Sequence, residues 1–330
     1  MLLERPLLRF DAVTKRYDGG GLLVQKRRSP PAVDAVTFDI ARGETFGLVG
    51  ESGSGKSTLA RLATGLLRPG EGAVWFDGIN LGSLLRRRDS LPVRRRIQMI
   101  FQDPGSSLDP RWTVRDIVAE PIRTHGLRPE GAALQHRVDE VLCFVGLTSR
   151  DGYRHPHEFS GGQRQRISIA RALAAEAEFI VCDEPTSALD VSIQAQILNI
   201  LVDLQRSLGL TYLFISHNLP VIAFMSHRIG VMYQGRLVEY GDARDVLGHP
   251  AHPYTRALVS TAQDPGQVLP SIGADADTVA QGWSAGCAFR GRCGAALPIC
   301  ARTSPLDIRN GNSLVACHAV GSPAEGVVAA

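Results

Sequence analysis

The sequence predicts an α/β fold: a parallel-sheet core with a β-rich antiparallel lobe, a helical subdomain and a small, loop-rich C-terminal extension. Three observations predict this arrangement. A glycine-rich loop follows a short apolar run near the N-terminus, three later apolar runs each end in polar side chains, and a long segment between them has the apolar spacing of helices.

The glycine-rich loop runs from Gly50 to Thr58 and reads Gly-Glu-Ser-Gly-Ser-Gly-Lys-Ser-Thr. The apolar run 46–49 before it is typical of a buried strand, and the apolar residues after it recur at helical spacing. A strand, a glycine-rich turn and a helix in this order are the context that a phosphate-binding loop requires.

The residue types within this loop indicate how it would bind phosphate. Gly50, Gly53 and Gly55 allow the backbone to turn its N–H groups toward an anion at the positive end of the following helix. We expect Lys56 to reach the terminal phosphates and Ser57 to hold a magnesium ion.

The three later apolar runs end in polar side chains. Residues 97–101 end at Gln102, residues 179–182 at Asp183 and Glu184, and residues 212–215 at Ser216 and His217. Each polar residue taken alone could simply mark a strand reaching solvent. Because ligands bind at the carboxyl ends of strands in open parallel sheets, we expect these side chains to meet at the phosphate loop.

The remaining segments define the other parts of the fold. Short strands separated by turns are expected at 7–10, 35–40 and within 70–81, with a polar surface excursion at 18–31. Helices are expected at 114–122, 134–145 and 163–175, which places a helical subdomain at about 103–175. The chain becomes loop-rich from about residue 241.

Charge and hydropathy limit the classes of function. The net charge of +3 is too mild to argue for nucleic-acid binding. No run of about 18 apolar residues is present, and the N-terminus lacks a signal-peptide pattern. We therefore expect a cytoplasmic protein that does not itself span a membrane.

Four of the six cysteines lie near the C-terminus, with five, six and sixteen residues between them: Cys287, Cys293, Cys300 and Cys317. In a reducing compartment such crowding favours a metal centre over a disulfide. The spacing does not choose between an iron–sulfur cluster and a zinc site that could include His318. Four free thiols are the simpler alternative.

Taken together, these motifs resemble the ATP-binding subunits of ABC transporters over about residues 7–247. The likeness rests on the ordered set Gly50–Thr58, Gln102, Ser160-Gly161-Gly162-Gln163, Asp183-Glu184, Ser187-Ala188-Leu189-Asp190 and His217. It implies a P-loop NTPase core of the ABC type that binds ATP and Mg²⁺.

The resemblance also implies a role for each matching residue. Tyr17 would stack on adenine, Glu184 would be the general base, and His217 would sense the γ-phosphate. Magnesium would be held by Ser57, Gln102 and Asp183. Residues expected to wrap the phosphates are Gly50, Ser52, Gly53, Ser54, Gly55, Lys56, Ser57 and Thr58. Residues expected to complete the site of a second ATP-binding subunit are Ser160, Gly161, Gly162 and Gln163, and Asp190 belongs to the same nucleotide-binding set.

A narrower likeness covers the C-terminal third. His252-Pro253-Tyr254-Thr255, Gly286-Cys287, Arg292-Cys293 and Ala316-Cys317-His318 resemble the ATPases of oligopeptide and dipeptide importers, a group that includes nickel systems. In that group this cysteine pattern is associated with a [4Fe–4S] cluster. The chain would thus divide into an ATPase domain at 1–247 and an extension at 248–330.

This likeness implies a peripheral subunit on the cytoplasmic face of the membrane. Its partners would be two transmembrane permease subunits, a second and related ATP-binding chain and, indirectly, an extracytoplasmic solute-binding protein. Two alternatives are a soluble ABC ATPase that acts on ribosomes or DNA and a subunit of an ABC exporter. The single ATPase cassette, without a long insertion before Ser160, favours the importer.

Overall fold

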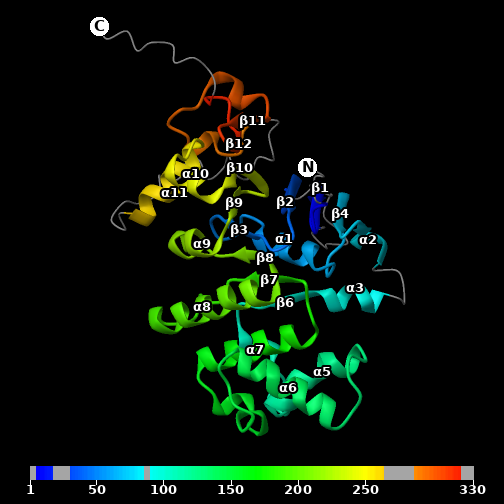
Figure 1. The fold of residues 1–330 in the computed structure, drawn as a ribbon. Helices are drawn as coiled ribbons and strands as arrows, with labels where there is room; N and C mark the ends of the chain where they lie inside the picture. The colour runs from blue at the N-terminus through cyan, green and yellow to red at the C-terminus, as the bar shows by residue number, and fades with distance from the viewer. Residues whose placement is uncertain (1–4, 18–29, 85–89, 264–285, 321–330) are drawn as a thin grey trace, which may run out of the picture.

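The structure is a computed structural model that describes residues 5–17, 30–84, 90–263 and 286–320. A central sheet separates the helical subdomain at one end of the molecule from the C-terminal segment at the other, as Figure 1 shows. In the described part of the chain, no helix is both long and apolar enough to cross a membrane. Most of the excursion predicted at 18–31 lies outside the described residues.

The large sheet has eight strands in the order β11-β12-β10-β9-β3-β8-β7-β6. Its strands are β3 (Thr45–Val49), β6 (Ile97–Ile100), β7 (Phe179–Asp183), β8 (Thr211–Ile215), β9 (Arg228–Tyr233), β10 (Arg236–Asp242), β11 (Asp307–Asn310) and β12 (Ser313–Ala316). The five strands from β9 to β6 are parallel. Strands β3 and β8 are buried throughout, which explains their uninterrupted apolar sequences.

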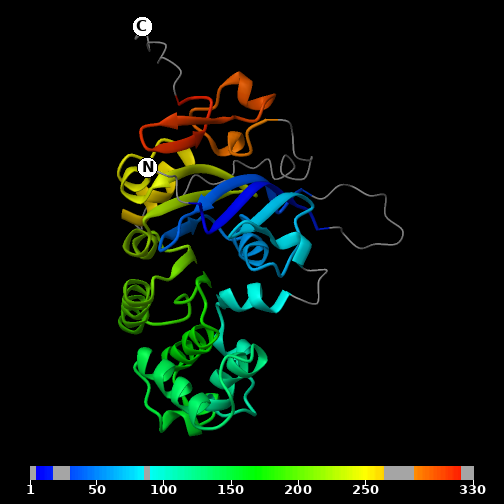
Figure 2. The same cartoon turned by 45° about the vertical axis from the view of Figure 1, so that its right-hand side comes forward.

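The second sheet is antiparallel and has the order β2-β1-β4-β5. Its strands are β1 (Leu8–Lys15), β2 (Val33–Ile40), β4 (Glu71–Phe76) and β5 (Ile79–Asn80). Stacked rings of Phe10, Phe38 and Phe46 join it to the large sheet. Figure 2 shows this lobe, in blue and cyan, lying beside the parallel strands. The predicted α/β core with an antiparallel lobe is confirmed.

The helices cover the large sheet and form the subdomain. Those around the large sheet are α1 (Lys56–Ala63), α3 (Leu91–Arg96), α8 (Val191–Leu208), α9 (Leu219–Met225), α10 (Ala243–Gly248) and α11 (Pro253–Gln263), whereas α2 (Leu81–Leu84) packs on β4 of the antiparallel sheet. Those between β6 and β7 are α4 (Pro104–Ser107), α5 (Val114–Thr124), α6 (Ala132–Phe144) and α7 (Gly161–Ala174), with the 3₁₀ turns η2 (Asp151–Tyr153) and η3 (Pro156–Glu158). Buried residues of α5, α6 and α7 pack together in the main core.

The C-terminal segment is more regular than the sequence predicts. It contains α10 and α11, the 3₁₀ turns η4 (Arg290–Arg292) and η5 (Pro298–Ala301), and a hairpin whose strand β12 pairs with β10. Phe289 is 3% exposed and joins the main core. The predicted small C-terminal extension is thus ordered in part by two strands that it adds to the large sheet.

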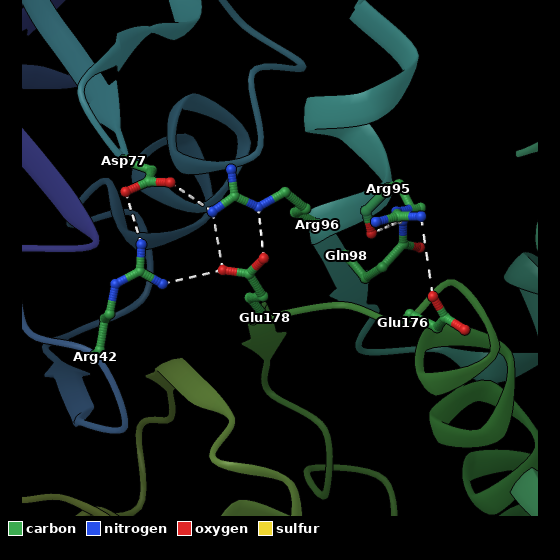
Figure 3. A network of polar contacts seen from close by, with 7 residues as sticks. All are labelled: Arg42, Asp77, Arg95, Arg96, Gln98, Glu176 and Glu178. Carbon is green, nitrogen blue, oxygen red and sulfur yellow. Dashed lines mark hydrogen bonds and ion pairs between the residues drawn. The ribbon is translucent and has the colours of Figure 1, made fainter. Parts of the chain in front are cut away.

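A network of charged side chains links the two sheets (Figure 3). Arg96, at the end of α3, donates to Asp77 at 2.6 Å and to both carboxylate oxygens of Glu178 at 2.6 and 2.9 Å. Arg42 bridges the same two carboxylates. The Arg96 guanidinium also lies 4.9 Å from the centre of the Phe76 ring. These contacts fix the antiparallel lobe against the start of β7.

We predict that Arg96→Ala lowers the free energy of unfolding by about 1 kcal/mol, because partly exposed bidentate pairs contribute modestly. Arg95→Ala should cost less than half as much, because the single pair of Arg95 with Glu176 is long, at 3.9 Å. Urea unfolding of the two variants measures the difference. Equal effects would contradict the importance given to the network.

The same network gives a dependence on pH. Hydrogen bonds from Arg96 lower the pKa of both Asp77 and Glu178. A depressed carboxyl pKa contributes stability that is present above the unfolded pKa and lost as the pH falls through the folded pKa. The difference between the parent protein and Arg96→Ala should therefore shrink below about pH 4.

Candidate functional site

The glycine-rich loop joins β3 to α1, as predicted, and two of its glycines are required by close backbone approach. A Cβ atom at Gly50 would collide with the carbonyl oxygen of Met232, and one at Gly55 with that of Ala32. Gly55 also has a φ of 106°, which side chains disfavour. Strand β9 and the segment before β2 thus pack directly against the loop backbone and leave no room for a side chain at these two positions.

The Lys56 ammonium lies inside this loop. It donates to the carbonyl oxygens of Gly50 and Glu51, both at 2.8 Å, and the residue is only 6% exposed. Burial lowers the pKa of Lys56, while the carboxylates of Glu184, Asp183 and Glu51 oppose that shift. The loop therefore holds a cation surrounded by backbone and carboxylates.

Asp183, at the end of β7, lies next to the start of α1. The Ser57 hydroxyl donates to its carboxylate at 3.3 Å. Burial raises the pKa of Asp183, and the hydrogen bond from Ser57 opposes that rise. Mg²⁺ prefers oxygen ligands and is usually bound by one or two protein side chains together with substrate phosphates. The neighbouring oxygens of Ser57 and Asp183 fit such an ion.

Glu184 brings together the other two strand ends. Its carboxylate accepts from Gln102 Nε2 at 3.3 Å and lies 3.2 Å from His217 Nδ1. The Glu184 side chain is 18% exposed, and its φ of 48° lies in the left-handed region. A non-glycine residue keeps this backbone conformation only where the surrounding structure fixes it, so tertiary contacts set the direction of the Glu184 side chain. The predicted meeting of the strand ends is therefore present in the structure.

Tyr17 lies at the edge of this cluster. Its hydroxyl is 3.3 Å from Thr58 Oγ1, and the residue is 45% exposed. The exposed ring lies beside the phosphate loop, where it could stack on a planar ligand. The adenine-stacking role of Tyr17 stays a prediction, and the position of the ring is compatible with it.

Ser160 to Gln163 open α7 and are positioned by helix capping. The Ser160 hydroxyl accepts from the Gln163 N–H at 3.3 Å, and the Gln163 side chain accepts from the Ser160 N–H at 3.0 Å. A Cβ at Gly162 would collide with Ile193 of α8, whereas Gly161 meets nothing closer than 3.5 Å. Among the described contacts, no hydrogen bond joins this turn to the phosphate loop of its own chain.

Asp190 has a local structural role. It caps α8 by accepting from the Ile193 N–H at 2.9 Å and from the Ser192 hydroxyl at 2.8 Å. The backbone hydrogen bond from Ile193 is the main reason that the pKa of Asp190 is lowered. A direct contact of Asp190 with nucleotide stays a prediction.

The four C-terminal cysteines lie near one another, but their arrangement does not support the predicted cluster. Cys287 donates its N–H to the carbonyl of Cys300 at 2.8 Å. Burial raises the pKa of the Cys287 thiol, and the neighbouring Cys300, Cys317 and Cys293 add to that rise. Over the described ranges, however, no three His, Cys, Asp or Glu side chains form a metal-ligating group.

The zinc alternative is likewise unsupported. His318 Nε2 lies 2.9 Å from the carbonyl oxygen of Thr303, so this ring nitrogen has a partner in the protein. Backbone hydrogen bonds and the packing of Phe289 hold the segment together.

Sequence reasoning missed a second set of residues at the loop. Arg292 pairs with Glu51 through two contacts of 2.9 Å, and the Glu51 N–H donates to the Tyr254 hydroxyl at 2.9 Å. Tyr254 and Arg292 stand within motifs of the C-terminal third, but more than 200 positions separate them from Glu51. No local pattern could have revealed this contact.

Two parts of the chain match known protein families. Residues 33–187 match the family described as ABC transporter. Residues 238–300 match the family described as oligopeptide/dipeptide transporter, C-terminal region. The second match spans β10 through η5, which includes the residues that contact Glu51.

Solved structures share the fold. A dimeric ATP-binding cassette in a post-hydrolysis state, bound to ADP and Pi, has a TM-score of 0.63 at 31% identity, over 72% of this chain and 99% of that one. CbiO1 of Clostridium perfringens, part of an ABC transporter complex, has a TM-score of 0.64 at 25% identity, over 79% of this chain and 97% of that one.

Curated relatives extend over nearly the whole length. The oligopeptide transport ATP-binding protein YkfD of Bacillus subtilis is 47% identical over 321 residues, which is 95% of each chain. OppF of the same organism is 52% identical over 237 residues, which is 72% of this chain and 78% of OppF. The chain therefore belongs to the ABC transporter ATPase family, in the group that carries the oligopeptide/dipeptide transporter C-terminal region.

Proposed function

We propose that this chain is the ATP-hydrolysing subunit of an importer for oligopeptides, dipeptides or a related small solute. The observation that carries the proposal is the match to a peptide import ATP-binding protein of Brucella ovis, and to YkfD, over more than 90% of this chain. These relatives do not favour the two alternatives, a ribosome- or DNA-directed ATPase and an exporter subunit.

The chemistry of the proposed reaction follows from the strand ends. Lys56 would bind the terminal phosphates, and Ser57 and Asp183 would hold a Mg²⁺ ion, which would supply neutralisation of the phosphate charge. Glu184 acts as the general base that orients the attacking water toward the γ-phosphate and takes its proton. His217 and Gln102 keep the Glu184 carboxylate in place. Positioning and charge neutralisation supply most of the acceleration in such a transfer.

The proposed domains and partners extend this function. We place the ATPase domain at 1–247, with its helical subdomain at about 103–175, and the extension at 248–330. Phe101, which precedes Gln102 in the chain, is 41% exposed, and Trp112, in the turn before α5, is 42% exposed. Large apolar side chains at the surface support docking of two permease subunits there, on the cytoplasmic face of the membrane. An extracytoplasmic solute-binding protein would act through the permeases.

We predict that Glu184→Gln retains MgATP binding but lowers the hydrolysis rate at least 100-fold, because the amide cannot take a proton from water. A matched control is Glu176→Gln, a glutamate that also has a positive φ but pairs with Arg128 away from the site. Phosphate release by the purified complex measures both rates. Near-normal hydrolysis by Glu184→Gln would refute the role assigned to Glu184.

The proposed pairing with a second ATP-binding chain rests on the exposed turn at Ser160. Ser160→Arg should leave nucleotide binding at the chain's own loop unchanged and lower hydrolysis by the assembled pair about 10-fold or more, because the bulky cation would obstruct the composite site. Ser149→Arg, in the same subdomain, should have no effect. Loss of binding by the isolated Ser160→Arg chain would show that the turn serves its own site.

We keep an iron–sulfur cluster at the four cysteines as a proposal that rests on their spacing alone, because the described residues contain no metal-ligating group. Anaerobically purified protein should then contain iron and acid-labile sulfide, and Cys293→Ser should lose both. Protein with stoichiometric zinc would replace the cluster by a zinc site. Metal-free protein would leave four thiols held by the local packing.

A further inference from the structure

The C-terminal segment reaches into the phosphate loop through a two-pronged ion pair. Arg292 Nη1 lies 2.9 Å from Glu51 Oε2, and Arg292 Nη2 lies 2.9 Å from Glu51 Oε1. The Arg292 side chain is only 10% exposed, and that of Glu51 is 33% exposed. A planar fork that meets a carboxylate in this way fixes direction as well as distance.

The backbone of Glu51 is held by a second group from the same region. Its N–H donates to the Tyr254 hydroxyl at 2.9 Å, and Tyr254 is fully buried. Glu51 is thus tied to the C-terminal third through both its main chain and its side chain. A loop residue held at two points has little freedom to change its conformation.

The groups that hold Glu51 are themselves rigidly packed. The rings of Tyr233, Tyr254 and Phe289 lie with their centres 4.7 to 5.5 Å apart, and the Arg292 guanidinium is 5.8 Å from the centres of the Tyr233 and Phe289 rings. This aromatic cluster packs against the Arg292 guanidinium and fixes its position.

The position of Tyr254 is fixed from the other side by a buried carboxylate. Glu239 accepts from the N–H groups of Ala251 and His252, both at 2.9 Å, and His252 Nδ1 accepts from the Tyr254 N–H at 3.0 Å. These bonds set the start of α11 and hence the place of the tyrosine hydroxyl.

Glu51 connects this anchor to the phosphate-binding cation. Its carbonyl oxygen accepts from Lys56 Nζ at 2.8 Å, and its carboxylate is one of three negative charges that face Lys56. An unpaired carboxylate at this place would repel the phosphates of a nucleotide. The two contacts of the Arg292 guanidinium neutralise this carboxylate and fix its direction.

We propose that Arg292, assisted by Tyr254, is a positioning residue for nucleotide binding, which holds the first turn of the phosphate loop and cancels the charge of Glu51. The oligopeptide/dipeptide-type C-terminal region then contributes directly to the affinity of the site for ATP. This inference rests on the proposed binding of ATP by the loop at 50–58.

The test is equilibrium binding of the magnesium complex of a non-hydrolysable ATP analogue to the full-length chain. Arg292→Gln should weaken binding about 10-fold, because a single uncompensated charge near the phosphates is sufficient for a change of that size. In hydrolysis assays the KM for ATP should rise in parallel while kcat changes less than about twofold.

Charge rescue separates this role from a merely structural one. Glu51→Gln combined with Arg292→Gln should bind the analogue more tightly than Arg292→Gln alone, within about threefold of the parent protein. Tyr254→Phe, which keeps the buried ring, should weaken binding modestly by releasing the Glu51 N–H. Arg290→Gln is the matched control, because Arg290 is in the same turn η4 but donates to Ala301, and it should bind like the parent.

The outcomes are distinct. If the parent protein binds the analogue and Arg292→Gln binds equally well, the positioning role is overturned. The role is also overturned if the double variant binds as weakly as Arg292→Gln, because the charge of Glu51 would then be irrelevant. Failure of the parent protein itself to bind would instead overturn the proposed function. If Arg292→Gln fails to fold, the comparison of Tyr254→Phe with the parent protein still tests the proposal. Unchanged affinity of Tyr254→Phe would contradict the claim that the C-terminal region holds Glu51 in place for nucleotide binding.

Discussion

The buried ammonium of Lys56 inside its glycine-rich loop is the interaction on which the rest of the site depends. The two main-chain carbonyls that hold the cation come from Gly50 and Glu51 in the loop itself. Two of the three carboxylates that face it come from the end of β7, so the site requires that two segments distant in sequence meet. The parallel strands supply this, because β3, β7, β8 and β6 deliver their carboxyl ends to one edge. The glycines that let β9 approach the loop are therefore as important as the charged residues.

The C-terminal region is structurally continuous with this core. Strand β12 extends the sheet that begins at β6, and Phe289 packs in the same apolar cluster as Tyr254. The ion pair of Arg292 with Glu51 also connects the C-terminal region directly to the phosphate loop. The packing therefore shows no division at residue 247, and the C-terminal family match already begins at residue 238.

Much of the fold was predictable because its signals are local. The apolar runs that became β3, β7 and β8 and the helical spacing of α5, α6 and α7 depend on neighbours a few positions away. The meeting of Asp183, Glu184, Gln102 and His217 followed from strand direction alone. The left-handed backbone of Glu184 could not be predicted, since it is imposed by tertiary contacts.

The long-range features were missed for the same reason. The pairing of β12 with β10 and the contact of Arg292 with Glu51 join segments that are distant in sequence, and neither leaves a local pattern. The cysteine spacing was a genuine local signal, yet it did not determine ligating geometry, because backbone hydrogen bonds and Phe289 already order that segment.

The most direct test of the account is the binding of MgATP to Lys56→Met, measured by titration calorimetry beside the parent protein. Methionine fills a similar volume without the charge, so the fold and its thermal midpoint should be retained. The account predicts a loss of affinity of about 10-fold or more, since the charge at the centre of the phosphate loop is gone. Unchanged affinity in a folded variant would contradict the claim that this buried cation organises the site.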